Sequence, residues 1–405
     1  MTRILGWVVM AFCLAAGSTP AAASSLRDRL GSASQTVGLT GGTAFDALAD
    51  VIADTAARAL PAVSASAGFT YRFNRELEIF ERSSETLGPV FLERPDTLGR
   101  SKFNVNVSFQ YVQFDAFDGQ DLGRLEAADP IVTRVVDGSG NLLGFTANRL
   151  RYDIGLRDYV TAFSFTYGIL DDLDVNLMVP LIQTDLDVGV TSQQRFIAGV
   201  DGNFVPALQA PVRGSTDGGA FGVGDVLLRL KYQLPRADWL RWAAGLQMRM
   251  PSGNQAAFQG ADTFEVSPAL YASTVLWKRV SPYANVAVDL RADDVARSEA
   301  RYGLGADVDV LPRLGLAFAF LGRSEFSESA SRGDTSFLHL VNGVPTSRPL
   351  LGLDFGRKDF FDFSFGLRAV VWREVMLFLN GIYALNDEGL RNDTIIPTVG
   401  VEGTF

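Results

Sequence analysis

The chain has 405 residues and a formal net charge of −10, with 36 basic against 46 acidic residues. This length fits one large barrel or two ordinary domains. The acidic balance and the lack of a lysine or arginine cluster in the sequence exclude a general nucleic-acid binder, which needs a basic face to neutralise phosphates.

The first 23 residues have the pattern of a secretory signal peptide. Arg3 supplies the positive start, residues 4–17 are apolar, and small residues precede a predicted cleavage site after Ala23. The apolar stretch is short, which favours a cleaved signal over a retained membrane anchor. The only cysteine, Cys13, lies in this segment, so the exported chain must be stabilised by packing and closed hydrogen bonding rather than by disulfides. Loss of Arg3 leaves 35 basic against 46 acidic residues, a net charge of −11.

Residues 24–101 differ from the rest and are predicted to form a plug-like or periplasmic segment. Apolar residues recur at helical spacing between a weak capping pattern at Thr43 and the break at Pro61, which predicts one amphipathic helix. The expected order is this helix, two extended pieces and a stretch punctuated by Gly and Pro, at residues 43–59, 68–73, 76–80 and 83–99. The segment either plugs a barrel or lies in the periplasm, or it adds two strands to a barrel of about fourteen, and these alternatives stay open.

Residues 102–405 repeat a pattern of strand, turn and strand with period-2 alternation, which predicts an all-β chain with about twelve strands. In the clearest strand, Asp225–Leu234, Val226, Leu228 and Leu230 face one way, and Arg229 and Lys231 face the other. The predicted strands begin near Lys102, Asp153, Leu173, Val223, Leu240, Phe264, Val280, Glu299, Leu314, Phe361, Val375 and Thr394.

The predicted connections alternate in length. Short turns such as 169–172 and 311–313 alternate with longer loops, of which the longest are 118–148, 189–222 and 322–358. Short turns on one side, longer loops on the other and an even strand number are typical of an antiparallel up-and-down barrel of the bacterial outer membrane.

A soluble β-sandwich is the alternative, because alternation alone does not say which face is wet. Three features favour the membrane barrel. The apolar faces carry no charge along whole strands, and the strands have about the ten residues that a tilted crossing of a bilayer needs. The chain also stops within a strand at Phe405, which resembles the C-terminal signal that the barrel assembly machinery recognises.

The sequence offers little catalytic chemistry. A hydrolase in the outer membrane would need a serine nucleophile with a histidine base. The chain has one histidine, His339, in a loop with Ser336, Asp334 and Asn342, and we expect an ordinary loop histidine there. The acidic stretches 114–122 and 137–141 lack the EF-hand spacing of a calcium loop, and turn formation explains both. We expect no enzyme activity, no cofactor and no metal.

The inward face of the barrel is where transport would be encoded. The alternation rule points a set of mixed-charge side chains into the lumen: Asp174, Asn176, Arg229, Lys231, Arg241, Arg249, Asp289, Arg291, Arg301, Asp307, Asp309 and Arg368. These side chains either line a substrate path or pair with one another and stabilise a hydrated lumen. At this strand number a narrow or gated route is expected rather than a wide pore.

Several motifs resemble a family of outer-membrane proteins named for the meta-pathway of phenol degradation. The resemblance is carried by Gly88–Arg94, Thr97–Arg100, Phe103–Val105, Phe114–Asp115, Asp118–Gly119, Tyr167–Ile169, Leu173–Val175, Val179–Leu181 and Gly222–Asp225. It implies a barrel that takes hydrophobic or aromatic compounds across the outer membrane, somewhat like long-chain fatty-acid transporters. It brings no catalytic residue with it.

We therefore expect a passive outer-membrane channel for small hydrophobic or aromatic compounds. Its expected partners are the outer-membrane lipid, the barrel assembly machinery and the substrate, with no nucleic acid. The alternatives are a structural or partner-binding barrel and, third, a barrel hydrolase that uses His339.

Overall fold

The computed structural model describes most of the chain after residue 90 and parts of the chain before it. The described residues are 25–37, 49, 52, 55–56, 64, 71–74, 79–82, 90–127, 130–207, 209–235, 237, 239–276, 279–327, 336–342, 344–349, 356–372 and 375–405. The predicted signal peptide lies outside these residues. Of the predicted helix at 43–59, the structure describes Ala49, Ile52, Thr55 and Ala56, which are helical, and the remainder lies outside the described residues.

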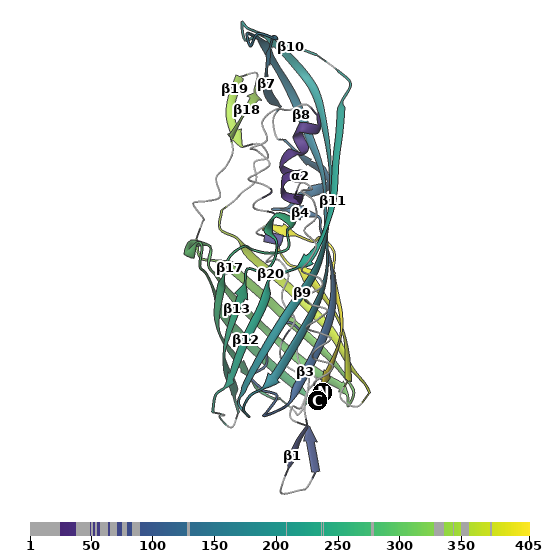
Figure 1. Cartoon of the computed structure of the whole chain (residues 1–405), viewed down its shortest axis with the longest axis vertical. Coiled ribbons are helices and arrows are strands. Elements are labelled where there is room, and N and C mark those ends of the chain that lie inside the picture. The colour runs from purple at the N-terminus through teal and green to yellow at the C-terminus, as the bar shows by residue number, and fades with distance from the viewer. Residues whose placement is uncertain are drawn as a thin grey trace.

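Twelve antiparallel strands close into a barrel within the described part of the chain (Figure 1). They are β3 (Phe103–Phe114), β8 (Leu142–Gly168), β9 (Leu173–Gly199), β12 (Val226–Gln233), β13 (Arg241–Met250), β14 (Glu265–Ser273), β15 (Val280–Arg291), β16 (Glu299–Leu311), β17 (Leu314–Glu325), β20 (Asp359–Trp372), β21 (Val375–Ala384) and β23 (Ile396–Thr404). The last strand closes on the first, with Val401 opposite Val107. This closure satisfies the backbone hydrogen bonds of every barrel strand from its neighbours, as a lipid environment requires.

The prediction of about twelve strands is confirmed. Eleven of the twelve predicted starts lie within three residues of an observed one, and Asp153 lies inside β8. The alternative of fourteen strands is wrong, because β1 (Tyr71–Asn74) and β2 (Ile79–Arg82) pair with each other in a separate two-stranded sheet. Figure 1 places this hairpin beyond the end of the barrel at which the chain ends.

Two barrel strands, β8 and β9, continue far beyond the barrel wall and, together with β11, build an extension above it (Figure 1). β8 and β9 have 27 residues each and pair along almost their whole length. β11 (Val212–Val223) pairs with the outer part of β9, and β12 follows it along the inner part. Shorter strands join them: β6 (Leu125–Glu126), β7 (Ile131–Val136), β10 (Phe204–Pro206), β18 (Ser336–Val341) and β19 (Val344–Pro349).

The predicted long loops 118–148, 189–222 and 322–358 are therefore wrong as plain loops, since each contains strand residues. β11 shows the reason: it holds four glycines among twelve residues, a composition that disfavours a strand. The strand forms nevertheless because its backbone pairs with β9 over its whole length. Local composition does not report that long-range pairing.

An N-terminal helix packs inside the extension. α2 (Leu26–Ser32) begins with a capping box in which Ser25 and Asp28 bond each other's backbone, and η1 (Ala33–Val37) continues it. A Cβ on Gly218 of β11 would lie 3.0 Å from the side chains of Leu26 and Arg29. The small residues of β11 thus allow the helix to lie directly against the strand.

The remaining short elements surround the upper end of the barrel. They are β4 (Ala116–Phe117), β5 (Gln120–Asp121), β22 (Leu390–Arg391), η2 (Leu122–Arg124), η3 (Gln255–Ala257) and η4 (Val295–Arg297). β4 pairs with both β5 and β22 in a three-stranded sheet. These connections and the extension lie at the end with long loops, which in barrels of this class faces the cell exterior.

The outer surface of the barrel is an apolar belt. Large apolar side chains on the outward positions are exposed, among them Phe109, Leu177, Leu270, Val286, Leu304, Phe363, Leu379 and Val399. Exposed aromatic residues gather at the short-turn end: Phe103, Tyr167, Tyr232, Trp242, Trp372 and Phe405. An apolar band with an aromatic girdle at the interface is the surface that a lipid bilayer covers. The protein is a transmembrane β-barrel of the outer-membrane type. Among the described residues, no helix is long and apolar enough to cross a membrane.

Candidate functional site: the plugged lumen

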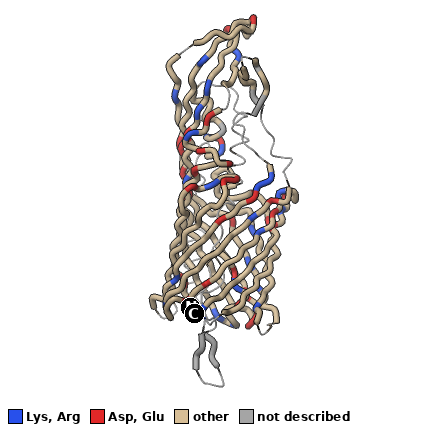
Figure 2. The backbone as a smooth tube through the Cα atoms, turned by 180° about the vertical axis from the view of Figure 1, so that it is seen from behind, with Lys and Arg blue, Asp and Glu red and all other residues tan. Residues whose placement is uncertain are grey.

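The barrel interior is polar, and the structure places the predicted lumen residues there. Seven of the nine main candidates are buried: Asp174, Asn176, Lys231, Asp289, Arg291, Asp307 and Arg368. The side chains of Arg229 and Arg249 are 11% and 17% exposed. Both charge signs run along the barrel strands and into the extension (Figure 2). Whether these residues line a transport path stays a prediction.

Several lumen charges pair within the barrel wall. Arg249 lies 3.0 Å from Glu265 and 3.8 Å from Asp225, and Arg301 lies 3.0 Å from Asp289. Arg291 at the end of β15 pairs with Asp293 of the following loop at 2.9 Å, and Arg368 of β20 lies 3.7 Å from Glu402 of β23. Of these pairs, Arg249–Glu265 and Arg301–Asp289 join neighbouring strands.

Residues 90–100, here called the plug segment, lie inside the lumen and contact charged residues of the wall. Glu93 lies 3.9 Å from Arg229 and 3.7 Å from Lys231. Both oxygens of Asp96 accept hydrogen bonds from Arg241, at 2.9 and 3.1 Å. The acidic residues of the plug segment thus contact basic residues of β12 and β13.

The basic residue of the plug segment, Arg94, contacts an acidic residue of the wall. Arg94 donates to Asp307 of β16 at 2.6 Å, and both side chains are 3% exposed. The Leu98 amide donates to Asp174 at 2.9 Å. The plug segment therefore carries an acid, base, acid order that the wall complements with base, acid, base, which fixes its register in the lumen.

The plug segment also makes apolar contacts with the barrel wall. Val90 and Phe91 pack against Phe378 and Ile382 of β21, whereas Leu92 packs against Tyr283 of β15. The plug segment therefore touches strands on several sides of the barrel. It is therefore held in the lumen by both buried ion pairs and apolar packing.

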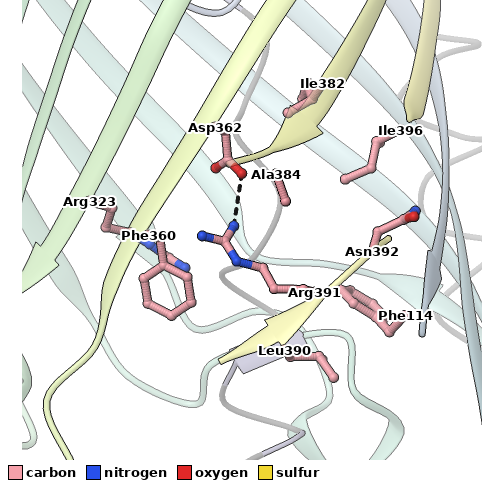
Figure 3. A pocket seen from close by; sticks show the side chains of 10 residues that line it. All are labelled: Phe114, Arg323, Phe360, Asp362, Ile382, Ala384, Leu390, Arg391, Asn392 and Ile396. Carbon is pink, nitrogen blue, oxygen red and sulfur yellow. Dashed lines mark hydrogen bonds and ion pairs between the residues drawn. The ribbon is translucent and has the colours of Figure 1, made fainter. Parts of the chain in front are cut away.

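A small pocket lies where the barrel meets the extension (Figure 3). Phe360 occupies its wall, with Arg323 4.0 Å and Arg391 4.8 Å from the ring centroid, and Arg391 pairs with Asp362 at 2.8 Å. The pocket has room for about one water molecule.

Above the mouth, the extension has an apolar core of its own. Leu26 and Leu30 of α2 are buried together with Leu186 and Val188 of β9 and with Phe258 of the inward loop after β13. Gln259 in the same loop donates to backbone carbonyls of β9 and β11, at 3.2 and 3.0 Å. The N-terminal segment therefore covers the outer end of the lumen.

The sequence analysis named the wall residues that hold the plug segment but did not single out the charges of the plug segment itself. Glu93, Arg94 and Asp96 stood in a stretch interpreted as Gly- and Pro-punctuated, and Phe360 and Arg391 were not singled out. One available signal was three charges within four residues, flanked by the apolar residues at 90–92 and 98. Buried charges of alternating sign need partners of opposite sign, and the lumen is where the chain offers them.

The residues considered for enzyme or metal chemistry take part in strand pairing, ion pairs and hydrogen bonds of the fold. His339 is a buried residue of β18, paired with Ile131 of β7, whereas Asp334 lies outside the described residues. Asp118 pairs with Lys358 at 3.0 Å and accepts the Gly389 amide at 2.7 Å. Within the described residues, no cluster of three or more His, Cys, Asp or Glu side chains has the arrangement of a metal site.

Two loop carboxylates are tuned by hydrogen bonds. Hydrogen bonds from the Asn141 side chain and backbone lower the pKa of Asp137, which closes the turn after β7. Burial alone would raise the pKa of Asp293, but hydrogen bonds from Arg291 and Thr263 outweigh it and lower the pKa to about 2. Both carboxylates are therefore anchors of the outer loops at neutral pH.

Residues 132–336 match the model of the family described as "Putative MetA-pathway of phenol degradation", and the match covers half of the chain. The chain belongs to this family. The matched part runs from β7 to the start of β18, so it includes the two long strands and the charged wall from β12 to β17. It begins after the plug segment, whose contacts are known from the structure alone.

Solved structures with a similar trace are also outer-membrane proteins. An outer-membrane channel from Pseudomonas putida F1 has 14% identity and a TM-score of 0.46, over 76% of this chain and 97% of that one. A FadL homologue from Pseudomonas aeruginosa has 9% identity and a TM-score of 0.33, over 75% and 89%. The P. putida toluene transporter TodX has 10% identity and a TM-score of 0.31, over 75% and 88%. These likenesses are remote and carry no inference about substrate. No curated protein matches the sequence.

Proposed function

We propose that the protein is a passive outer-membrane channel for small hydrophobic or aromatic compounds, opened when the plug segment leaves the lumen. The observation that carries the proposal is a plug segment held in a closed membrane barrel by ion pairs and packing. Such contacts are non-covalent, so the segment can leave and return. The solute moves down its own gradient, and the plug segment sets when it passes.

The family supports the aromatic class of solute. Its description refers to phenol degradation, a pathway that begins with an aromatic compound. The mouth pocket has matching chemistry, because Phe114 and Phe360 line it beside two guanidinium groups. An aromatic solute can exchange contacts with these rings and cations as it enters.

The test compares uptake with the plug segment free and fixed. Cysteines at Asp96 and Arg241, joined by a reducible cross-linker, hold the segment to β13. We expect labelled phenol to enter vesicles that contain wild-type protein faster than empty vesicles, the cross-linked protein to match empty vesicles, and a reductant to restore entry. A labelled fatty acid tests the hydrophobic class. Equal rates in all samples would refute the channel.

A partner-binding barrel is the second candidate, and the extension is what favours it. The outer parts of β8, β9 and β11 and the helix α2 form a unit with its own core above the membrane. A partner-binding protein would keep this surface and show no solute flux. Two results together favour this candidate: whole cells no longer bind the partner protein when the extension is removed, and the vesicle assay shows no uptake.

Assembly into the outer membrane is proposed to depend on the C-terminal strand. Phe405 is 72% exposed on the outer surface, and its backbone pairs with Phe103 across the seam of the barrel. We expect Phe405→Ala to lower the amount of folded barrel in the outer membrane, measured by heat-modifiable migration on gels. Phe326→Ala is the matched control, since Phe326 is an exposed loop residue. Equal loss in both variants would contradict the role of Phe405.

A further inference from the structure

Two carboxylates of the plug segment rest on three basic side chains of neighbouring strands. Glu93 bridges Arg229 and Lys231 of β12, and Asp96 is held by Arg241 of β13. We call Arg229, Lys231 and Arg241 the carboxylate cradle. The Arg241 contact is the tightest, with one nitrogen donating to both carboxylate oxygens at 2.9 and 3.1 Å.

More positive charge lies close to this cradle. Arg249 and Arg301 are near enough to Arg229 to act on it as like charges, and Glu93 is the acid that counters it. Clustered cations in a part-buried site repel one another unless an anion lies among them. Arg249 and Arg301 already pair with carboxylates of the wall, and Glu93 of the plug segment adds a carboxylate that contacts Arg229 and Lys231.

An aromatic side chain completes the site. Tyr271 of β14 lies close to both Glu93 and Arg229. Its ring lies over Gly245 of β13, where an added Cβ would be 2.6 Å from the ring. The missing side chain at Gly245 gives the ring its place in the lumen beside the cradle.

The plug carboxylates contact the wall at three cations. Removal of the plug segment takes Glu93 from Arg229 and Lys231, and Asp96 from Arg241. Lys231 also lies opposite Asp174 in the register of β12 and β9. Arg229 and Arg241 are therefore the cations on which an incoming anion replaces the plug carboxylates.

We propose that the lumen selects aromatic carboxylates. The solute's carboxylate takes the place of Glu93 and Asp96 on Arg229 and Arg241, and its ring lies against Tyr271. Two carboxylates of the protein's own chain already occupy these positions, so the geometry for a carboxylate is built. This inference rests on the proposed channel function and narrows its substrate class.

The same exchange links binding to opening. A carboxylate that binds the cradle competes with Glu93 and Asp96, so it favours the state in which the plug segment is out. A neutral aromatic compound of the same size has no such differential contact and shifts the equilibrium less.

The test is the current through the full-length protein in a planar bilayer, with sodium benzoate as probe and sodium chloride as reference. Glu93→Gln with Asp96→Asn loosens the plug segment without shortening the chain. In this background we expect openings and a reversal potential that favours benzoate over sodium. Adding Arg229→Gln and Arg241→Gln should lower that permeability ratio at least threefold. Adding Arg291→Gln instead is the matched control, because it removes a lumen cation outside the cradle and should leave the ratio within about 1.5-fold.

The outcomes separate the two proposals. Openings with no preference for benzoate, or with a preference that survives Arg229→Gln and Arg241→Gln, overturn the inference and leave the channel standing. No openings in any variant, with heat-modifiable migration showing folded barrels and with no phenol uptake in vesicles, overturn the channel and the inference with it. A preference that falls with the cradle substitutions and not with Arg291→Gln supports both.

Discussion

The Arg94–Asp307 pair is expected to hold the plug segment in the lumen. Asp307→Asn keeps the shape of the side chain and removes its charge. Both partners are 3% exposed, and breaking a buried pair costs about 3–5 kcal/mol. Asparagine still accepts a hydrogen bond, so we expect the lower end, about 3 kcal/mol. Because the barrel wall is closed independently of this pair, the cost falls on the position of the plug segment rather than on the fold.

A shift of about 3 kcal/mol corresponds to about a hundredfold change in the population of the released state. The assay is maleimide labelling of Leu98→Cys, since Leu98 is 2% exposed while the plug is in place. We expect Asp307→Asn to raise the labelling rate by up to a hundredfold. Asp289→Asn is the control, because Asp289 pairs with Arg301 of the wall at 3.0 Å.

A double substitution tests the reasoning more strictly. Arg94→Met removes the cation that Asp307→Asn leaves buried, so the double variant should label more slowly than Asp307→Asn alone. A labelling rate in Asp307→Asn within twofold of the wild type would refute the idea that this pair holds the plug segment.

Three further predictions concern the extension, the mouth and the outer loops. Gly218→Val should displace α2, because even a Cβ at this position lies 3.0 Å from Leu26 and Arg29; limited proteolysis should then cut the N-terminal segment faster while the barrel stays heat-modifiable. Phe360→Ala removes the ring between two guanidinium groups and should lower the stability of the mouth by about 1–2 kcal/mol, seen as a lower Tm in differential scanning calorimetry, whereas an unchanged Tm would contradict it. The pKa of Asp293 is lowered to about 2, so the stability that this carboxylate gives is fully present above the unfolded pKa of about 3.9 and is lost as the pH falls through about 2. Protease sensitivity of the loop 292–298 should therefore be equal at pH 7 and pH 5. A rise at pH 5 would contradict this.

The barrel could be predicted from sequence because its signal is local and repeated. Alternation along a strand such as β12 follows from one lipid face and one lumen face, and it needs no knowledge of the partner strands. The strand count follows when the same pattern recurs.

The plug contacts could not be predicted in this way. Arg94 and Asp307 are 213 positions apart, and their pairing depends on where the barrel places β16 relative to the plug segment. β11 has the same difficulty, since its glycine content disfavours a strand and its pairing with β9 supplies one. In both places the contact depends on the long-range geometry of the fold, and local amino-acid composition predicts little of that geometry.

The path of the chain through its own barrel sets an order of assembly. Residues 26–37 lie against β11 on the outer side, residues 90–100 lie in the lumen, and β3 then begins at the short-turn end beside Phe405. A folded helix with its apolar contacts cannot pass through a lumen that the plug segment fills. We therefore expect the wall to form around an N-terminal segment that already reaches the outer side, or this segment to cross before its ion pairs are made. The seam between β23 and β3 joins the last barrel strand to the first. Once this seam has closed, the N-terminal segment can no longer enter the barrel from the side.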